Sequence, residues 1–398
     1  MDTYTLRELT ADDFPAVVDL LGRAFLIEYD SGAIAEKDAS LFGSSRNLGA
    51  FDGGRLVGNL RVLPREVSVP GRGLVPFDGI SMVVVASDHR RRGLLNRLMR
   101  ETLTEAGTPL AGLWASEAQI YGRFGFGTAS EATEFEVPAG AAFRPEIAPD
   151  VSSVRELPRD EAMAAVRETY ARFAERTPGV LGREGAHWDA HYFEAGKPGV
   201  NPRRFAVHPD GYATFRTTVN WGDRGPDGLL ELHELVALTP DAYAGLWRYA
   251  LDVDLVGTVT ALGATDELLP LLLANPRAAV RKTHHALHVR LTRVPEALAL
   301  RTYAADADVV VELADEFCPW NAGRWRLGIS GGEATVAATT DPADLSTSST
   351  ELGAAFLGGT RLAALAAAGR VQEHTPGAVT VLSRAFQGDR DPFCGEVF

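Results

Sequence analysis

The most specific local signal in the sequence is Val83-Val84-Val85-Ala86-Ser87-Asp88-His89-Arg90-Arg91-Arg92-Gly93-Leu94-Leu95. It places an apolar strand, a basic turn and the start of a helix in immediate succession. Backbone N–H groups at a helix N-terminus form an anion site, and Gly93 lets a phosphate approach the backbone closely. Arg90, Arg91 and Arg92 add positive charge in a chain whose formal net charge is −14. The pattern predicts a polyanion in this turn; the alternative is a basic surface loop.

The segments around this motif alternate between strands and helices. A helix is expected over Ala11–Phe25, followed by two β-hairpins. Strand patterns at Leu110–Ala115 and Thr133–Val137 are expected to close this first α/β unit. Residues 138–149 are rich in Ala, Gly and Pro and are typical of a linker.

Two more units are expected after the linker. The second carries an amphipathic helix over Glu161–Arg176 and a helix that ends at Leu251. After about Leu291, two strands precede two Ala/Leu-rich helices. At roughly 100–200 residues per domain, a chain of 398 residues holds two or three domains. The sequence therefore predicts domains at residues 1–145, 150–288 and 289–398.

Composition excludes several classes of protein. With 45% hydrophobic and 23% charged residues, the chain fits neither a disordered nor a fibrous protein. No apolar run reaches the ~20 residues of a membrane span, and the N-terminus lacks the pattern of a secretory signal. Cys318 and Cys394 are too few for a disulfide framework or a cysteine-rich zinc site, which fits a reducing cytoplasm. The acidic balance argues against nucleic acid and favours cationic partners, unless it reflects only a solvated surface.

Two motifs carry a resemblance to a known family. Arg90-x-x-Gly93-x-Leu95 is similar to the pyrophosphate signature (Gln/Arg)-x-x-Gly-x-(Gly/Ala) of GNAT acetyltransferases, although Leu95 replaces a small residue. Together with Ala115-Ser116-Glu117-Ala118-Gln119-Ile120-Tyr121-Gly122-Arg123-Phe124-Gly125-Phe126-Gly127, it resembles the Eis (enhanced intracellular survival) family of actinobacterial acetyltransferases over the whole chain. The resemblance implies an α+β or mixed α/β fold of tandem GNAT domains, with mixed central sheets flanked by helices. It also implies a C-terminal domain similar to sterol carrier proteins.

Acetyl-CoA is the cosubstrate that the resemblance implies. The apolar strand would hold the pantetheine arm and thioester, and its oriented N–H donors would polarise the thioester carbonyl. The basic turn would hold the pyrophosphate, and the residues after the next strand would lie beside the cofactor. The residues implied are Val83, Val84, Val85, Arg91, Arg92, Gly93, Leu94, Leu95, Asn96, Ser116 and Glu117.

The resemblance also implies two catalytic groups. Tyr121 matches the family's general acid; a phenol with a pKa of about 10 can hand a proton to the leaving thiolate. Alternatively, Tyr121 is an aromatic anchor for a short helix. The C-terminal carboxylate of Phe398 would be the base, although a pKa of about 3.3–3.7 makes it weak unless it is desolvated or acts through water. The alternative is a frayed tail, but apolar Phe393 and Val397 argue against full solvation.

Acidic and aromatic residues are candidates for binding a polycationic amine. Glu28, with Asp30, Glu36 and Asp38, follows the first helix, where GNAT enzymes commonly form an acceptor lip. Trp114 could form an aromatic wall, and Glu396 lies next to the proposed base. For each, a surface acid or a core tryptophan is the alternative.

The second unit offers an internal comparison. Leu232–Asp241 repeats the pattern of Ser81–Asp88 but has neither the arginines nor the placed glycine. We therefore expect the second domain to shape the substrate groove and to hold no cofactor. We expect no metal either, because His187 and His191 lack a partner glutamate in the His-Glu-x-x-His sense.

The sequence thus predicts a cytoplasmic N-acetyltransferase that acts on primary amines of polycationic small molecules such as aminoglycosides, by direct attack in a ternary complex. One alternative keeps the fold but changes the acceptor to protein lysine or a polyamine. Another is a non-catalytic lipid- or ligand-binding protein with a vestigial GNAT domain. The family resemblance further implies a homohexamer, with no membrane or nucleic-acid partner.

Overall fold

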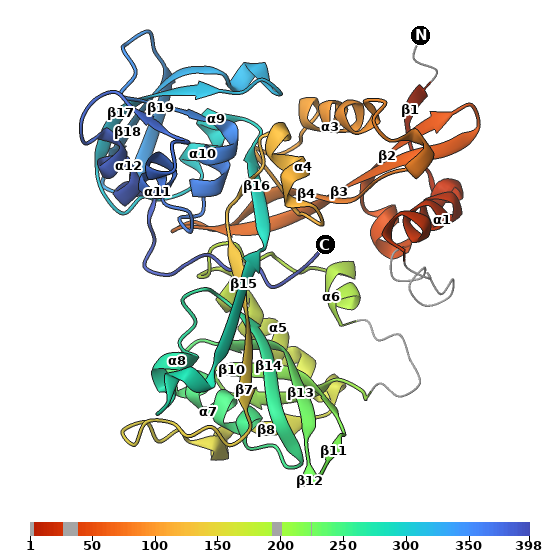
Figure 1. Cartoon of the computed structure of the whole chain (residues 1–398), viewed down its shortest axis with the longest axis vertical. Coiled ribbons are helices and arrows are strands. Elements are labelled where there is room, and N and C mark those ends of the chain that lie inside the picture. Colours follow the sequence, from red (N-terminus) through yellow and green to blue (C-terminus); the bar gives the residue numbers. More distant parts are fainter. Residues whose placement is uncertain (1–3, 27–38, 193–200, 224) are drawn as a thin grey trace.

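The computed structural model describes residues 4–26, 39–192, 201–223 and 225–398, which fold around three large sheets. Figure 1 shows three lobes, with the C-terminus between them. Each sheet is mixed and carries flanking helices, as expected. Within the described ranges, no helix is long and apolar enough to cross a membrane.

The first sheet has seven strands in the order β1-β2-β3-β4-β5-β16-β6. Helix α1 packs on β3 and β4, and helix α3 packs on β2 and β3. Figure 1 shows the two helices on opposite faces of the sheet. The elements are β1 (Tyr4–Glu8), α1 (Phe14–Phe25), β2 (Arg46–Asp52), β3 (Arg55–Val69), β4 (Gly73–Val85), α3 (Leu94–Thr104), β5 (Leu110–Trp114), α4 (Ala118–Tyr121), β6 (Gly127–Thr128) and β16 (Leu287–Leu291).

The second sheet also has seven strands, in the order β15-β7-β14-β13-β10-β9-β8, and α5 and α7 pack against it. Thr239 caps α7 by accepting a hydrogen bond from the Ala242 N–H, and Pro240 occupies its first turn. The elements are β7 (Glu131–Pro138), β8 (Arg155–Leu157), α5 (Arg159–Ala174), α6 (Ala186–His191), β9 (Arg204–His208), β10 (Gly211–Thr218), β11 (Trp221–Gly222), β12 (Gly225–Pro226), β13 (Gly228–Ala237), α7 (Pro240–Leu251), β14 (Val256–Gly263), α8 (Leu269–Leu272) and β15 (Val280–His285).

The first two lobes exchange strands. Thr133–Val137 was expected to close the first unit, and this is wrong: β7 pairs with β14 and β15 of the second sheet. In turn, β16 inserts between β5 and β6 of the first sheet. An alternating apolar pattern predicts a strand but not the partner that covers it. The domain ranges 1–145, 150–288 and 289–398 stay a prediction. They do not match the sheets strand by strand, because β7 and β16 each join the sheet of the other lobe.

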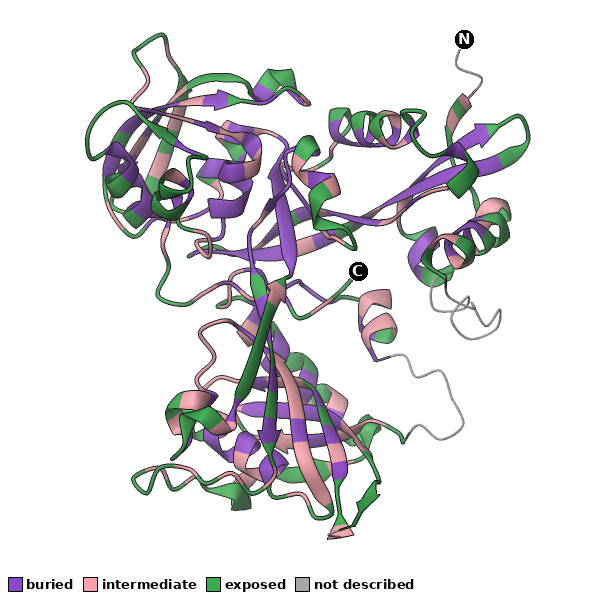
Figure 2. Ribbon diagram, in the orientation of Figure 1, coloured by how far each residue is buried: buried purple, intermediate pink, exposed green. Residues whose placement is uncertain are grey.

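The third lobe is a five-stranded sheet in the order β19-β18-β17-β20-β21. Its core is continuous with that of the first sheet, because Phe77 and Leu110 belong to the same buried cluster as Val309 and Phe356. Figure 2 shows this buried region running between the two lobes. The elements are α9 (Val294–Ala299), β17 (Ala307–Ala314), β18 (Gly323–Ser330), β19 (Glu333–Ala338), β20 (Leu345–Ser348), α10 (Ser349–Ala355), α11 (Leu362–Ala367), β21 (Gln372–Glu373) and α12 (Ala378–Phe386).

Candidate active site

Strands β4 and β5 separate in the middle of the first sheet. In their parallel pairing, Asp78 lies opposite Ala111 and Gly79 lies opposite Gly112, whereas β4 continues to Val85. On its other edge β4 carries a β-bulge at Met82, which has a φ of 47° and accepts a hydrogen bond of 2.8 Å from Asn59 Nδ2. A bulge bends the strand and increases its twist. Among the residues that the structure describes, the edge of β4 around Val83–Val85 therefore has no strand partner on the β5 side, and an extended ligand could bond to its backbone there.

The basic turn leads from this edge into α3. Arg91 and Gly93 both adopt left-handed backbone conformations, with φ of 61° and 78°. The first N–H groups of α3 have no partner within the helix. Space is open around the Gly93 α-carbon, and Arg91 is exposed. Arg92 donates to Tyr4 Oη and to the Asp88 carbonyl, both at 3.0 Å, which braces the turn.

These features fit a pyrophosphate group. A helix N-terminus offers backbone N–H groups to an anion, and the arginines of the turn supply the opposite charge. The expected cofactor residues thus come together at one end of the first sheet: Val83, Val84 and Val85 on β4, Arg91, Arg92 and Gly93 in the turn, and Leu94, Leu95 and Asn96 in the first turn of α3. Ser116 and Glu117 are exposed in the turn between β5 and α4.

Tyr121 ends the short helix α4 and is buried. Burial raises the pKa of its hydroxyl, and the charge of Glu117 raises it further, so the phenol stays protonated well above neutral pH. The Tyr121 ring packs edge-on against Phe126. The geometry is compatible with both a proton donor and a packing anchor.

The loop that follows Tyr121 is held by other parts of the chain. Thr350 Oγ1 of α10 donates to the Gly122 carbonyl at 2.8 Å, and Arg290 of β16 donates to the Phe124 carbonyl at 2.5 Å. Arg290 also forms a fully buried ion pair with Asp315 at 2.6 Å. The third lobe and β16 together thus fix the position of α4.

The C-terminal residue is packed in the structure. The Phe398 ring lies edge-on to Phe77, with 6.3 Å between centroids, and the Arg65 guanidinium lies 5.9 Å from the Phe398 centroid. A β-carbon on Gly79 would come within 2.9 Å of Phe398 Cε2. Gly79 is also the last residue of β4 that pairs with β5. Phe398 therefore lies at the point where the two strands separate.

Trp114, at the end of β5, contacts the tail. Its Nε1 donates to Cys394 Sγ at 3.5 Å, and Cys394 Sγ donates to the Glu396 carbonyl at 3.5 Å. Burial raises the pKa of the Cys394 thiol to about 11, so it stays protonated and is no nucleophile. Trp114 also lines an open cavity of about 670 Å³ together with Glu134, Glu136, Glu231, Gly395 and Val397.

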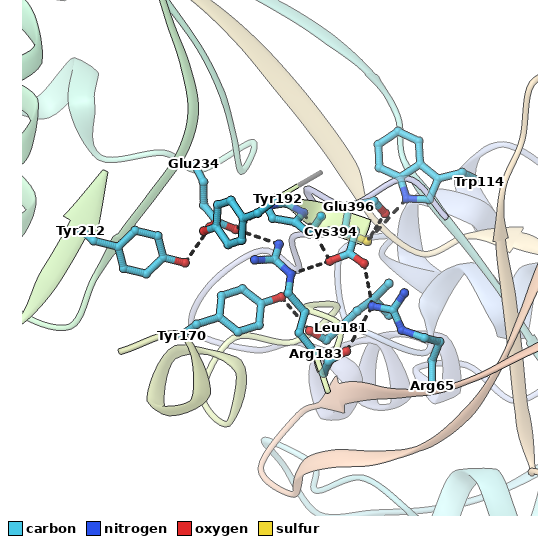
Figure 3. A network of polar contacts seen from close by, with 12 residues as sticks. Arg65, Trp114, Tyr170, Leu181, Arg183, Tyr192, Tyr212, Glu234, Cys394 and Glu396 are labelled. Atoms are coloured by element: carbon cyan, nitrogen blue, oxygen red, sulfur yellow. Dashed lines mark hydrogen bonds and ion pairs between the residues drawn. The ribbon is translucent and has the colours of Figure 1, made fainter. Parts of the chain in front are cut away.

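Glu396 lies in a buried network of charges (Figure 3). Its carboxylate oxygens face Arg65 at 2.7 Å and Arg183 at 2.6 Å. Arg183 also pairs with Glu234 at 2.8 Å. Burial raises the pKa of Glu396, but the two guanidinium groups outweigh it and hold the pKa at about 2. Two tyrosines complete the network by donating to Glu234: Tyr192 at 2.9 Å and Tyr212 at 2.6 Å.

Sequence reasoning missed Arg65, Arg183 and Glu234. They come from β3, a loop before α6, and β13, and nothing in their spacing relates them to Glu396. The one available signal was a glutamate inside the apolar run of β13. Glu28 lies outside the described residues. His187 and His191 lie on α6 beside this network, and the described part of the chain has no group of three side chains suited to a metal ion.

Models of known families match three stretches of the chain. Residues 5–129 and 179–294 each match an acetyltransferase (GNAT) domain. Residues 294–395 match a sterol carrier protein domain. The expected fold class, tandem GNAT domains followed by a sterol-carrier-like domain, is confirmed.

Similar proteins cover the whole chain. An uncharacterized N-acetyltransferase of Streptomyces avermitilis is 38% identical over 98% of both chains. N-acetyltransferase Eis of Mycobacterium tuberculosis is 33% identical over 97% of this chain and 98% of its own. The crystal structure of Eis1 from Mycobacterium abscessus superposes with a TM-score of 0.88 at 30% identity, over 99% of this chain and all of that one. The chain therefore belongs to the Eis family of GNAT N-acetyltransferases, enzymes that use acetyl-CoA.

Proposed function

We propose that this enzyme acetylates primary amines of polycationic small molecules such as aminoglycosides, by direct attack in a ternary complex. The observation that carries the proposal is the position of Phe398 against Gly79, where β4 and β5 separate. The tail is thereby brought to the end of the strand edge that fits the thioester. The proposed cofactor residues are those that line this edge and the basic turn.

The reaction requires a polarised thioester carbonyl, a base for the amine proton and an acid for the leaving thiolate. The amine nitrogen attacks the thioester carbonyl carbon, a C–N bond forms and the C–S bond breaks. The amine proton passes to the C-terminal carboxylate of Phe398, directly or through water, and Tyr121 gives its phenolic proton to the departing thiolate. The raised pKa of Tyr121 keeps that proton in place until the thiolate forms.

Charge next to the tail favours a cationic acceptor. Glu134, Glu136 and Glu231 are exposed on strands of the second sheet and line the same open cavity as Trp114 and Val397. Lys282 and Arg281 share this cavity, so its field is mixed. A molecule with several spaced ammonium groups can match three carboxylates while a single amine reaches the thioester. We propose Trp114 as part of the acceptor wall on this basis, and Glu28 by resemblance alone.

The test is release of CoA from acetyl-CoA in the presence of aminoglycosides, polyamines or lysine peptides, with the native C-terminus. Turnover with several aminoglycosides is the expected result. Turnover confined to lysine peptides or polyamines would replace the acceptor but keep the chemistry. Acetyl-CoA binding without any turnover would contradict the proposed acceptor class, and loss of binding as well would favour a vestigial domain.

A matched variant tests the acid. Tyr121→Phe keeps the ring against Phe126 and removes only the hydroxyl. We expect kcat to fall by about 10²-fold or more, with unchanged acetyl-CoA binding. Equal turnover would assign Tyr121 to packing. We also propose a homohexamer and a cytoplasmic location from the family likeness; light scattering of the purified chain checks the first.

A further inference from the structure

The second domain repeats the strand separation of the first. Its parallel pair β13–β14 is in register only as far as Leu232–Ala261, and β13 then continues to Ala237. In the first sheet, the corresponding parallel pair β4–β5 ends at Gly79–Gly112. Beyond this point the second domain has no basic turn, because β13 runs directly through Thr239 into α7.

The C-terminal tail lies where the strands of the second domain separate. Glu234, Leu235 and Val236 of β13 and Leu262 of β14 line a small cavity together with Phe393, Gly395 and Glu396 of the tail. The Phe393 N–H donates to the Pro178 carbonyl at 2.8 Å, next to this cavity. In the first domain, the separated strands fit a cofactor. In the second domain, the corresponding strands contact the C-terminal tail.

Charges from both GNAT domains meet on the tail. Arg65 comes from β3 of the first sheet, and Arg183 and Glu234 come from the second domain. The side chains of Arg65 and Arg183 are 2% and 3% exposed, so their pairs with Glu396 are shielded from water and salt. Arg183 is fixed further by Glu234 and by the ring of Tyr170, 4.0 Å from its guanidinium carbon. Glu396 thus has one preferred position.

This network is better suited to positioning than to stability. Burying charges costs much of what their attraction returns, and apolar replacements of buried ion pairs are often as stable. An ion pair fixes the orientation of the side chains, because each carboxylate oxygen faces a particular guanidinium nitrogen. Only Val397 lies between Glu396 and Phe398, so fixing the Glu396 side chain limits where Phe398 can lie. Arg65 acts on both, since it also lies near the Phe398 ring.

We propose that Arg65 and Arg183 are positioning residues that hold Glu396, and that the second GNAT domain uses its separated strands to clamp the C-terminal tail so that Phe398 lies on β4. We call the four side chains Arg65, Arg183, Glu234 and Glu396 the tail clamp. The inference deepens the proposed function and rests on it for the catalytic use of the tail. Glu396 then serves the tail and is not a ligand of the substrate.

The test measures how firmly Phe398 is held, independently of catalysis. Full-length protein is treated with carboxypeptidase under native conditions, and release of free phenylalanine is followed with time. Arg65→Met and Glu396→Gln should each release Phe398 at least about tenfold faster than the native chain. The control is Arg204→Met, which breaks a partly exposed pair with Glu156 in the same domain and should leave release unchanged.

Kinetics separate the clamp from a general loss of structure. The clamp variants should lose about 10- to 100-fold in kcat while KM for acetyl-CoA stays the same, since misplacing a reacting group by about 1 Å has an effect of this size. A third variant, Arg183→Met, would leave the carboxylates of Glu234 and Glu396 buried without this partner and could fail to fold. Glu396→Gln still tests the proposal in that case, because the amide keeps the shape of the side chain and loses its charge. Unchanged phenylalanine release in both Arg65→Met and Glu396→Gln would overturn it.

One comparison distinguishes failure of the clamp from failure of the proposed base. Native enzyme from which carboxypeptidase has removed Phe398 is assayed for CoA release. Full turnover would refute the base, while faster release in the clamp variants would still support the clamp. Slow release in every variant together with loss of turnover on removal of Phe398 would support the base and overturn the clamp.

Discussion

Gly79→Ala should displace the C-terminal residue with very little other change. The new β-carbon would lie 2.9 Å from Phe398 Cε2 and 3.1 Å from Cδ2, whereas ordinary contact begins at 3.4 Å. It would also lie 3.3 Å from the Leu63 carbonyl oxygen, which is only slightly too close. The aromatic ring cannot bend away, so Phe398 must move by at least about 0.5 Å. The backbone of Gly79 needs no positive φ, so the substitution brings no conformational strain of its own.

The magnitude follows from the position of Phe398. Overpacking of this kind costs about 1–3 kcal/mol of stability, which a folded domain tolerates. A reacting group displaced by a fraction of 1 Å loses about 10- to 100-fold in rate. We therefore expect kcat for CoA release to fall by that factor, while the Kd of acetyl-CoA changes less than threefold (about 0.6 kcal/mol).

The control is Gly54→Ala in the exposed turn between β2 and β3, where an added β-carbon meets nothing within 4 Å. It should match the native enzyme in both kcat and melting temperature. If Gly79→Ala folds, binds acetyl-CoA and keeps native kcat, Phe398 does not take part at this position and the reasoning fails.

Three further predictions concern the cofactor turn, the buried charges and pH. Arg91→Gly removes a cation without backbone strain, because glycine tolerates the φ of 61° at this position. KM should rise about tenfold for acetyl-CoA but not for acetyl-pantetheine, which lacks the pyrophosphate. An equal rise for both substrates would place the pyrophosphate elsewhere. Arg290→Met leaves Asp315 buried without its partner and should cost about 3–5 kcal/mol in chemical denaturation; a loss below 1 kcal/mol would show that Asp315 is solvated. Burial lowers the pKa of His191 to about 4, so the unfolded chain binds a proton below pH 6.5 that the folded chain does not. His191 alone should therefore lower the free energy of unfolding by about 3 kcal/mol from pH 6.5 to 4, and His187, whose pKa is also about 4, should add to this fall. His191→Asn should flatten that decline, and an unchanged slope would assign it to other groups.

Local sequence signals predicted the parts of the site that lie close together along the chain. The apolar run, the arginines and Gly93 predicted a strand, a basic turn and a helix start, and the structure has these three in order. The left-handed backbone of Arg91 and Gly93 is added by the structure. The helix predicted over 161–176 is present as Arg159–Ala174, and the helix predicted to end at Leu251 is present as Pro240–Leu251. Such features depend on neighbours within a few residues, so their physical causes are visible in the sequence.

Contacts between distant segments could not be predicted in the same way. Thr133–Val137 reads equally well as a strand of either sheet, and its pairing with β14 and β15 depends on residues more than 100 positions further along the chain. The tail clamp joins residues 331 positions apart, Arg65 and Glu396. An arginine on a strand normally predicts a solvated face, and nothing local indicates that a carboxylate from the other end of the chain will cover it. The burial of these charged side chains, which is visible only in the folded chain, is what led to the proposed role of the tail clamp.

Moving the C-terminal carboxylate tests whether acetyl transfer takes place beside it. Two glycines added after Phe398 leave every side chain in place but shift the charge along the tail. We predict that kcat falls by about 10²-fold or more while acetyl-CoA binds as before. An extended chain that releases CoA at the native rate with the same amines would contradict the account.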